Sequence, residues 1–188
     1  MAKSLPLTFV TGNQNKADYL AKYLGVAIDH RKLDLDEIQS LNLHTVVEHK
    51  VRQAYGQLQS PVLVEDVSLE FNALGRLPGT FIRFFVDELS FEDICRLLDG
   101  KARGATARCT FAYFDGAELI LFDGAMRGRI ADHPAGENGF GWDKIFIPEG
   151  YDITRAQMDE ENDRHTYLQI KPFGKVKAYI DTLKLSQT

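Results

Sequence analysis

The chain has 188 residues, of which 44% are hydrophobic and 11% aromatic, and this suits one domain with a core of useful size. Its net charge of −5 gives little attraction to the phosphates of a nucleic acid. No apolar run reaches the roughly 18 residues of a membrane span, and Met1 to Pro6 is too short and polar for a signal peptide. We expect a single cytoplasmic domain over residues 1–188 that binds neither nucleic acid nor membrane.

The first part of the chain is predicted to alternate strands and helices. Apolar residues recur at helical spacing in two segments, and the short apolar run after Pro61 is typical of a buried parallel strand. Gly25 favours the end of the first helix. In chain order the pattern predicts a strand at 5–11, a helix at 16–24, a strand at 26–35, a helix at 45–58 and a strand at 62–65.

The second part of the chain introduces a hairpin. Asp115-Gly116 joins two long segments of strand-like sequence and favours a tight turn between them. The full prediction is a loop at 72–79, helices at 81–86 and 91–98, strands at 106–114 and 118–130, a Gly-rich loop at 136–141, a strand at 145–147 and a helix at 175–183. Alternating strands and helices followed by a hairpin predict an α/β fold with a mixed sheet.

The two cysteines, Cys95 and Cys109, form no C-x-x-C pair, so the sequence gives no support for a zinc or redox motif. We interpret both as buried or half-buried thiols in a reducing compartment. The five histidines show no metal-ligand spacing either. The predicted chemistry therefore depends on lysine, carboxylate and aromatic residues.

The segment Thr11-Gly12-Asn13-Gln14-Asn15-Lys16 lies between the first predicted strand and helix. A helix N-terminus presents unpaired N–H groups and a positive dipole end, and both attract anions. Thr11 and Asn13 add side-chain donors, and Lys16 adds a cation. The same pattern fits an ordinary turn in which asparagine caps the helix. A phosphate site and a capped turn are both open, although the P-loop pattern G-x-x-x-x-G-K-[ST] is absent.

Acidic residues stand at the predicted ends of two strands. Glu65 and Asp66 close the third predicted strand, and because successive strand residues point to opposite faces, one can face a helix while the other faces a site. In open α/β sheets, sites gather beyond the carboxyl ends of strands. Glu37 follows the second strand and could share Mg²⁺ with Asp66, since Mg²⁺ prefers carboxylate oxygens and retained waters. We interpret Asp34 and Asp36 as surface acids.

A third candidate is the segment N-G-F-G-W-D, which ends at Asp143. Its glycines let the backbone approach a ligand closely, and the rings of Phe140 and Trp142 offer surfaces on which a base stacks. The Asp143 carboxylate can accept hydrogen bonds from the N–H groups of a base. A turn that holds two core aromatic side chains is the alternative.

Together these motifs resemble one known family. The order T-G-N-x-x-K, then L-V-E-D, then F-G-W-D, with Leu77-Pro78-Gly79 and Cys109-Thr110-Phe111-Ala112 in register, is similar to that of the inosine triphosphate pyrophosphatase family over roughly residues 5–150. This family hydrolyses non-standard purine nucleoside triphosphates, such as ITP and XTP, to a monophosphate and pyrophosphate. The resemblance implies an elongated mixed sheet with helices on both sides, two lobes around a central cleft, Mg²⁺ as cofactor and a homodimer.

The resemblance also implies a role for each matching residue. The expected phosphate-binding residues are Thr11, Gly12, Asn13, Lys16, Lys50 and Arg83, and the expected base-binding residues are Phe140, Gly141, Trp142 and Asp143. Glu37 and Asp66 match magnesium ligands. Asp66 also matches the proton acceptor in catalysis, and Lys16 is the second expected catalytic residue.

The sequence departs from the family at its base-side segment. Where the family has a lysine and then Ser-His-Arg, this chain has Glu161 to Tyr167, and Val67 replaces a serine or threonine after Asp66. Two hypotheses follow. Either Arg164, His165 and Lys144 supply the missing donors and the preference for purines survives, or base specificity is changed or relaxed.

Two further functions compete with this interpretation. A Maf-like nucleotide pyrophosphatase shares the general architecture, but it fits the T-G-N-x-x-K and F-G-W-D motifs less well. A catalytically impaired nucleotide-binding regulatory protein would explain the missing Ser-His-Arg. The complete set of phosphate and metal candidates argues against it, because a protein that only binds has less reason to keep them all.

Overall fold

The computed structural model of the chain describes residues 7–25 and 28–185. The chain divides into two compact units. Unit 1 comprises Met1–Asp66, Thr110–Asp123 and Pro172–Thr188, and unit 2 comprises Val67–Cys109 and Gly124–Lys171. No helix of the described segments is long and apolar enough to cross a membrane.

Within the described residues, seven strands form one mixed sheet, which confirms the predicted α/β class. The strands follow in the order β2 (Asp29–Arg31), β1 (Thr8–Val10), β3 (Val62–Phe71), β5 (Gly104–Phe114), β6 (Leu119–Ile130) and β7 (Phe146–Pro148), and β4 (Pro78–Gly79) pairs with β3. β1 runs parallel to both β2 and β3, with Thr8 opposite Asp29 and Val62. β4 is antiparallel to β3, and β7 is antiparallel to β6.

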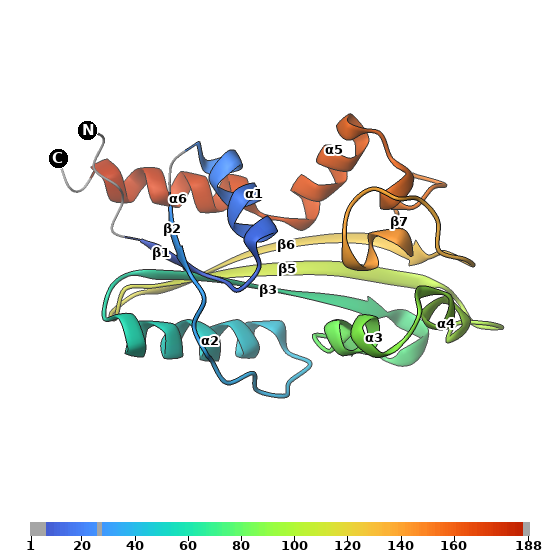
Figure 1. Cartoon of the computed structure of the whole chain (residues 1–188), viewed down its shortest axis with the longest axis horizontal. Coiled ribbons are helices and arrows are strands. Elements are labelled where there is room, and N and C mark those ends of the chain that lie inside the picture. Colours follow the sequence, from blue (N-terminus) through green and yellow to red (C-terminus); the bar gives the residue numbers. More distant parts are fainter. Residues whose placement is uncertain (1–6, 26–27, 186–188) are drawn as a thin grey trace. The chain divides into compact units, whose positions relative to one another are not determined.

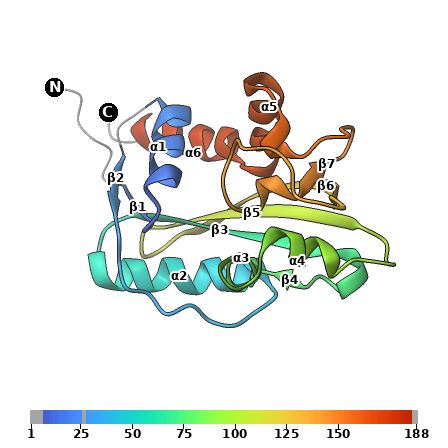
Figure 2. The same cartoon turned by 45° about the vertical axis from the view of Figure 1, so that its right-hand side comes forward.

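Unit 1 has helices on both faces of its part of the sheet. Figures 1 and 2 show α1 (Gln14–Leu24) and α6 (Phe173–Leu185) on one face and α2 (Leu43–Leu58) on the other. α1 and α6 are joined by a stacked contact between Tyr23 and Phe173, whose ring centroids lie 4.8 Å apart. The apolar stripe of α2 packs its buried Val47 and Val51 against strand residues such as Val64. This burial fixes the helices that carry Lys16 and Lys50.

In unit 2, α3 (Ile82–Glu88) and α4 (Phe91–Arg96) lie on one face of the strands, and α5 (Glu160–Ile170) lies on the other (Figures 1 and 2). Three one-turn 3₁₀ helices complete the unit: η1 (Asn72–Leu74), η2 (Gly141–Lys144) and η3 (Arg155–Gln157). η2 contains most of the F-G-W-D segment. It therefore belongs to the same unit as α5 and η3.

Two predicted strands have the wrong length. The strand predicted at 62–65 continues as β3 to Phe71, so Glu65 and Asp66 lie inside a strand and do not close it. The continuation is stabilised by the buried side chains of Leu69 and Phe71 and by pairing with β4. The strand predicted at 26–35 is limited to β2, whose three residues are all exposed, while residues 26–27 lie outside the described part.

The helix α5 was not expected from the sequence. Its N-cap is Asp159, whose side chain accepts a hydrogen bond from the Asn162 N–H group. Acidic residues fill its first turn, where they interact favourably with the helix dipole. This cap and the acidic turn were the local signals available. The weakly apolar helix face, which buries Thr166 and Tyr167, explains why periodicity alone missed it.

Candidate functional site

The turn after β1 is a preformed helix cap. The Asn13 carboxamide oxygen accepts a hydrogen bond from the Lys16 N–H group at 3.3 Å, and the Thr11 hydroxyl oxygen accepts one from the Asn13 N–H group at 3.1 Å. Asn13 is thus the N-cap of an 11-residue helix, as one of the two interpretations predicted. The cap does not conflict with an anion site, because the dipole of α1 still presents its positive end here.

Two lysine–carboxylate pairs flank β3. Lys16 of α1 lies 3.3 Å from Glu65, and Lys50 of α2 lies 3.1 Å from Asp66. Because α1 and α2 cover opposite faces of the sheet, the two consecutive carboxylates point to opposite faces, as the strand period predicts. The two lysine side chains are 19% and 20% exposed. Each cation is therefore held by a carboxylate but is still accessible to solvent.

This arrangement suits the binding of a polyanion. A triphosphate carries more negative charge than one carboxylate and can compete for a partly exposed lysine. If Lys50 turns to a phosphate, the Asp66 carboxylate loses its cation partner. A carboxylate in that state can bind a hard metal ion or accept a proton from water. β1 ends at Val10 and pairs with β3 only as far as Leu63, so a ligand at this edge of β3 can approach Lys16 from one face and Lys50 from the other.

A glutamine on α2 holds the segment that carries Glu37. The Gln53 side-chain amide donates to the Asp36 carbonyl oxygen at 3.2 Å and accepts from the Asp36 N–H group at 3.0 Å. One turn later, Gln57 donates to the Asp34 carbonyl oxygen at 3.0 Å. α2 thus positions both Lys50 and the backbone beside Glu37. Sequence reasoning missed this clamp, whose signal is the spacing of the two glutamines on one helix face.

The two predicted magnesium ligands, Glu37 and Asp66, are both accessible carboxylates. No group of three or more His, Cys, Asp or Glu side chains in the described ranges is arranged to hold a metal ion. Glu37 is exposed, and Asp66 is partly exposed. Mg²⁺ is commonly held by one or two carboxylates together with phosphate oxygens and waters. Glu37 and Asp66 carry oxygens of this kind, so their chemistry suits Mg²⁺.

The F-G-W-D segment forms a tight loop in unit 2. Gly139 and Gly141 have positive φ angles of 73° and 61°. One Asp143 carboxylate oxygen accepts a hydrogen bond from the Phe140 N–H group at 3.0 Å. The Trp142 ring packs edge-on against Phe146, and the Phe140 ring is exposed. The loop therefore packs the half-buried Trp142 ring against Phe146 and presents the Phe140 ring to solvent.

Arg155 is a buried partner of this loop that sequence reasoning missed. Its guanidinium forms ion pairs at 2.6 Å with Asp143 and with Asp163, and its Nε donates to the Thr166 hydroxyl at 3.2 Å. Arg155 is only 3% exposed. Burial raises the pKa of Asp143, while the Arg155 guanidinium opposes that rise. Both oxygens of the Asp143 carboxylate are engaged within the protein.

The other predicted residues of unit 2 lie on its surface. Arg83 forms an i,i+4 pair with Asp87 on α3 at 3.4 Å. Arg164 is exposed on α5, and a ring nitrogen of the exposed His165 lies 2.9 Å from the Gln169 amide. Lys144 pairs with Glu137 at 3.0 Å. Unit 1 thus contains Thr11 to Lys16, Glu37, Lys50 and Asp66, and unit 2 contains the remaining predicted residues.

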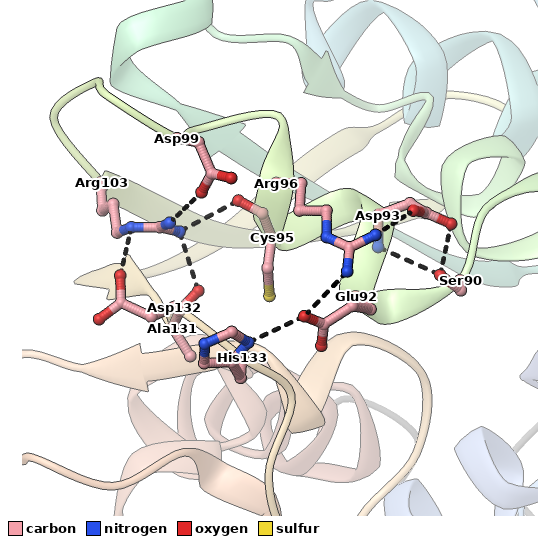
Figure 3. Close-up of polar contacts among 10 residues, drawn as sticks. All are labelled: Ser90, Glu92, Asp93, Cys95, Arg96, Asp99, Arg103, Ala131, Asp132 and His133. Atoms are coloured by element: carbon pink, nitrogen blue, oxygen red, sulfur yellow. Dashed lines mark hydrogen bonds and ion pairs between the residues drawn. The ribbon is translucent and has the colours of Figure 1, made fainter.

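A separate polar cluster in unit 2 is centred on Arg103 and includes the backbone of Cys95 (Figure 3). Arg103 donates to the carbonyl oxygens of Cys95 and Ala131 at 3.1 and 3.0 Å and forms ion pairs with Asp99 and Asp132. It thereby ties the end of α4 to the end of β6. Burial raises the pKa of the Cys95 thiol to about 11, against the smaller opposing effect of Arg103. Cys95 is thus a buried thiol, as predicted, and the second cysteine is also buried.

Comparisons with known proteins give a consistent result. A model of the Ham1 family matches residues 7–177. A protein of Yarrowia lipolytica named inosine triphosphate pyrophosphatase is 38% identical over 182 residues, which are 94% of this chain and 96% of that protein. Inosine triphosphate pyrophosphatase 2 of Trypanosoma cruzi is 39% identical over 178 residues, 92% of this chain and 91% of that protein. The solved structure of the Staphylococcus aureus Ham1 protein matches with a TM-score of 0.75 and 25% identity, covering 94% of this chain and 98% of that one.

Proposed function

This chain belongs to the Ham1 family, and we propose that it is an enzyme that hydrolyses non-standard purine nucleoside triphosphates, such as ITP and XTP, to a monophosphate and pyrophosphate. The observation that carries the proposal is the pair of accessible lysines, Lys16 and Lys50, each held by a carboxylate of β3. Such an enzyme removes damaged nucleotides from the nucleotide pool. The family match favours this function over a Maf-like enzyme.

The phosphate-binding groups of unit 1 bind and orient the triphosphate. The N-terminus of α1, with Thr11, Gly12 and Asn13, attracts phosphate oxygens. Lys16 and Lys50 leave their carboxylate partners and bind the phosphates instead. Asp66 then accepts a proton from the attacking water. Water adds to the α-phosphorus. The bond from this phosphorus to the oxygen that bridges the α- and β-phosphates breaks, and pyrophosphate leaves with the electron pair.

Mg²⁺ is the proposed cofactor, and Glu37 and Asp66 would hold it. When bound, it offsets the negative charge that develops on the leaving pyrophosphate. The Gln53 clamp on Asp36 restricts the backbone next to Glu37, which keeps this carboxylate near one position. In this proposal Asp66 serves both as a metal ligand and as the proton acceptor.

The F-G-W-D loop is the proposed contact for the base. The exposed Phe140 ring offers a stacking surface. Arg164 and His165 are exposed donors on α5, and either they replace the missing Ser-His-Arg or base specificity is relaxed. Arg83, also exposed, is the proposed additional cation for the triphosphate.

The proposal includes a homodimer in the cytoplasm that does not bind nucleic acid. Apolar side chains of Leu77, Phe84 and Leu89 are exposed on and around α3, and a second copy of the chain would cover them. Two buried thiols suit a reducing compartment. Light scattering during gel filtration tests the dimer, for which a mass of one chain is the contrary result.

The proposed activity is tested with a panel of nucleotides. Purified protein with Mg²⁺ is offered ITP, XTP, dITP, a modified pyrimidine triphosphate and ATP, and pyrophosphate release is measured. Faster release from ITP and XTP than from ATP supports purine preference, whereas similar rates support relaxed specificity. If no member yields pyrophosphate, the proposed function is wrong.

Asp66→Asn separates an enzyme from a regulatory binding protein. The variant removes the proton acceptor but keeps the shape of the side chain, so we expect turnover to fall by roughly 100-fold or more. Binding of ITP, followed by the fluorescence of Trp142, is expected to persist. The matched control is Asp152→Asn, which affects only the surface pair with Arg129. Equal turnover by Asp66→Asn and the wild type would remove Asp66 from the mechanism.

A further inference from the structure

Arg155 joins two segments of unit 2 that come from different parts of the sequence. From η3 it reaches Asp143 in η2, and it reaches Asp163 and Thr166 in α5. Its guanidinium also lies over the ring of Tyr167, with its central carbon 5.2 Å from the ring centroid. A planar guanidinium can serve several acceptors at fixed angles, which an ammonium group cannot do. One side chain therefore connects η2 to α5.

The contact at Asp143 extends to the exposed ring of the loop. One carboxylate oxygen accepts from Arg155, and the other accepts from the N–H group of Phe140. The carboxylate thus fixes the backbone of the residue that offers its ring to solvent. On the other side, Asp163 lies next in sequence to Arg164 and His165. Both segments with candidate base contacts are connected through one guanidinium.

We infer that Arg155 is the positioning residue for base recognition: by holding Asp143 and Asp163 it sets the orientation of the 140–143 loop and of the first turns of α5. This inference rests on the proposed function. It gives Asp143 the role of a loop anchor, in place of the direct base contact expected from the sequence. A guanidinium that is almost completely buried takes no part in phosphate binding.

The inference predicts a selective effect on the nucleoside part of the substrate. In Arg155→Met, we expect the KM for ITP to rise roughly 10- to 100-fold, because misplaced binding groups lose their contacts, while kcat changes less than about threefold. Inhibition by inorganic tripolyphosphate, which has neither base nor sugar, is expected to keep its Ki. Arg155→Lys keeps the charge but loses the planar set of donors, and its KM for ITP should lie between those of the wild type and Arg155→Met. Parallel losses for ITP and tripolyphosphate, or no change for either, would overturn the inference.

A second readout does not depend on turnover. Trp142, the only tryptophan in the sequence, lies in η2 and reports on the loop directly. Without nucleotide, Arg155→Met is expected to increase acrylamide quenching of its fluorescence, since the loop loses its anchor. If the wild type does not hydrolyse ITP, the proposed function is wrong. If acrylamide quenching of Trp142 is the same in Arg155→Met as in the wild type, the inference is wrong.

Two further variants keep the test decisive. Arg129→Met is the control, because Arg129 belongs to the same unit but pairs with Asp152 on the surface, and it should change neither KM nor quenching. Asp163→Asn removes one partner of Arg155 at a partly exposed position and should raise the KM for ITP by a few-fold. If Arg155→Met does not fold, Asp163→Asn decides: a rise in KM supports the inference, and an unchanged KM overturns it.

Discussion

The two units use charged residues in opposite ways. In unit 1, the cations of Lys16 and Lys50 are paired with carboxylates but are still accessible, so an incoming anion can displace their partners. In unit 2, the cation of Arg155 is closed off from solvent and bound to three groups of the protein. The first arrangement is suited to binding a ligand, and the second is suited to holding a loop in place.

This difference shows that a match to a functional motif does not by itself assign a role. Asp66 and Asp143 both match family positions, and both are paired with a cation. The Asp66 pair is partly exposed, whereas the Asp143 pair is buried, and a buried ion pair that is broken leaves a costly unpaired charge. Burial therefore distinguishes a carboxylate that can act on substrate from one that supports the fold around it.

The largest expected effect is that of Lys16→Ala. It removes a phosphate-binding cation and leaves the Glu65 carboxylate buried without this partner. We expect kcat/KM for ITP to fall by about 100-fold or more and the free energy of unfolding to fall by about 3 kcal/mol. In Lys16→Met/Glu65→Leu, urea unfolding should show recovered stability while activity stays low. Recovery of both would mean that Lys16 serves the fold alone.

The next prediction compares how much the free energy of unfolding falls when one cation is removed from each unit. Arg155→Met leaves the buried Asp143 carboxylate without its ion-pair partner, so we expect a loss of about 3 kcal/mol in the free energy of unfolding. Lys50→Met breaks a partly exposed pair, and we expect a loss of about 1 kcal/mol or less. Chemical denaturation measures both variants. Equal losses would contradict the contrast between accessible and buried pairs.

Gln53→Ala tests whether α2 positions the metal ligand. The two hydrogen bonds to the Asp36 backbone are lost, so Glu37 is held less firmly. We expect the Mg²⁺ concentration for half-maximal activity to rise by roughly 10-fold, with little change in the rate at saturating Mg²⁺. Gln57→Ala, which loses one hydrogen bond to Asp34, is the matched control and should have a smaller effect. Unchanged Mg²⁺ dependence would remove the clamp from the metal site.

The smallest effect concerns acid stability in unit 1. Burial acts to raise the pKa of Asp123, but hydrogen bonds from Thr110 and His44 and the charge of His44 outweigh it and lower this pKa below 3.8. A lowered pKa stabilises the fold above the unfolded-state value, and this stability is lost as pH falls through the folded-state pKa. Asp123→Asn should therefore reduce the stability difference between about pH 7 and about pH 3. Asp152→Asn, an exposed control in unit 2, should not.

The sequence predicted local features well because their causes are local. The cap at Asn13, the left-handed Gly25 that ends α1 and the opposite faces of Glu65 and Asp66 depend on neighbouring residues alone. The length of β3 was wrong, since its continuation depends on pairing with β4 and on distant packing. Arg155 and Gln53 could not be assigned, because their partners lie 8 to 17 residues away and are set by tertiary structure.

The most direct test of the central claim is the identity of the products. Wild-type protein is incubated with ITP and Mg²⁺, and all phosphorus-containing products are quantified by ³¹P NMR. The proposal predicts one IMP and one pyrophosphate for each ITP consumed, with no IDP accumulating. Formation of IDP and orthophosphate, or no consumption of ITP, would contradict it.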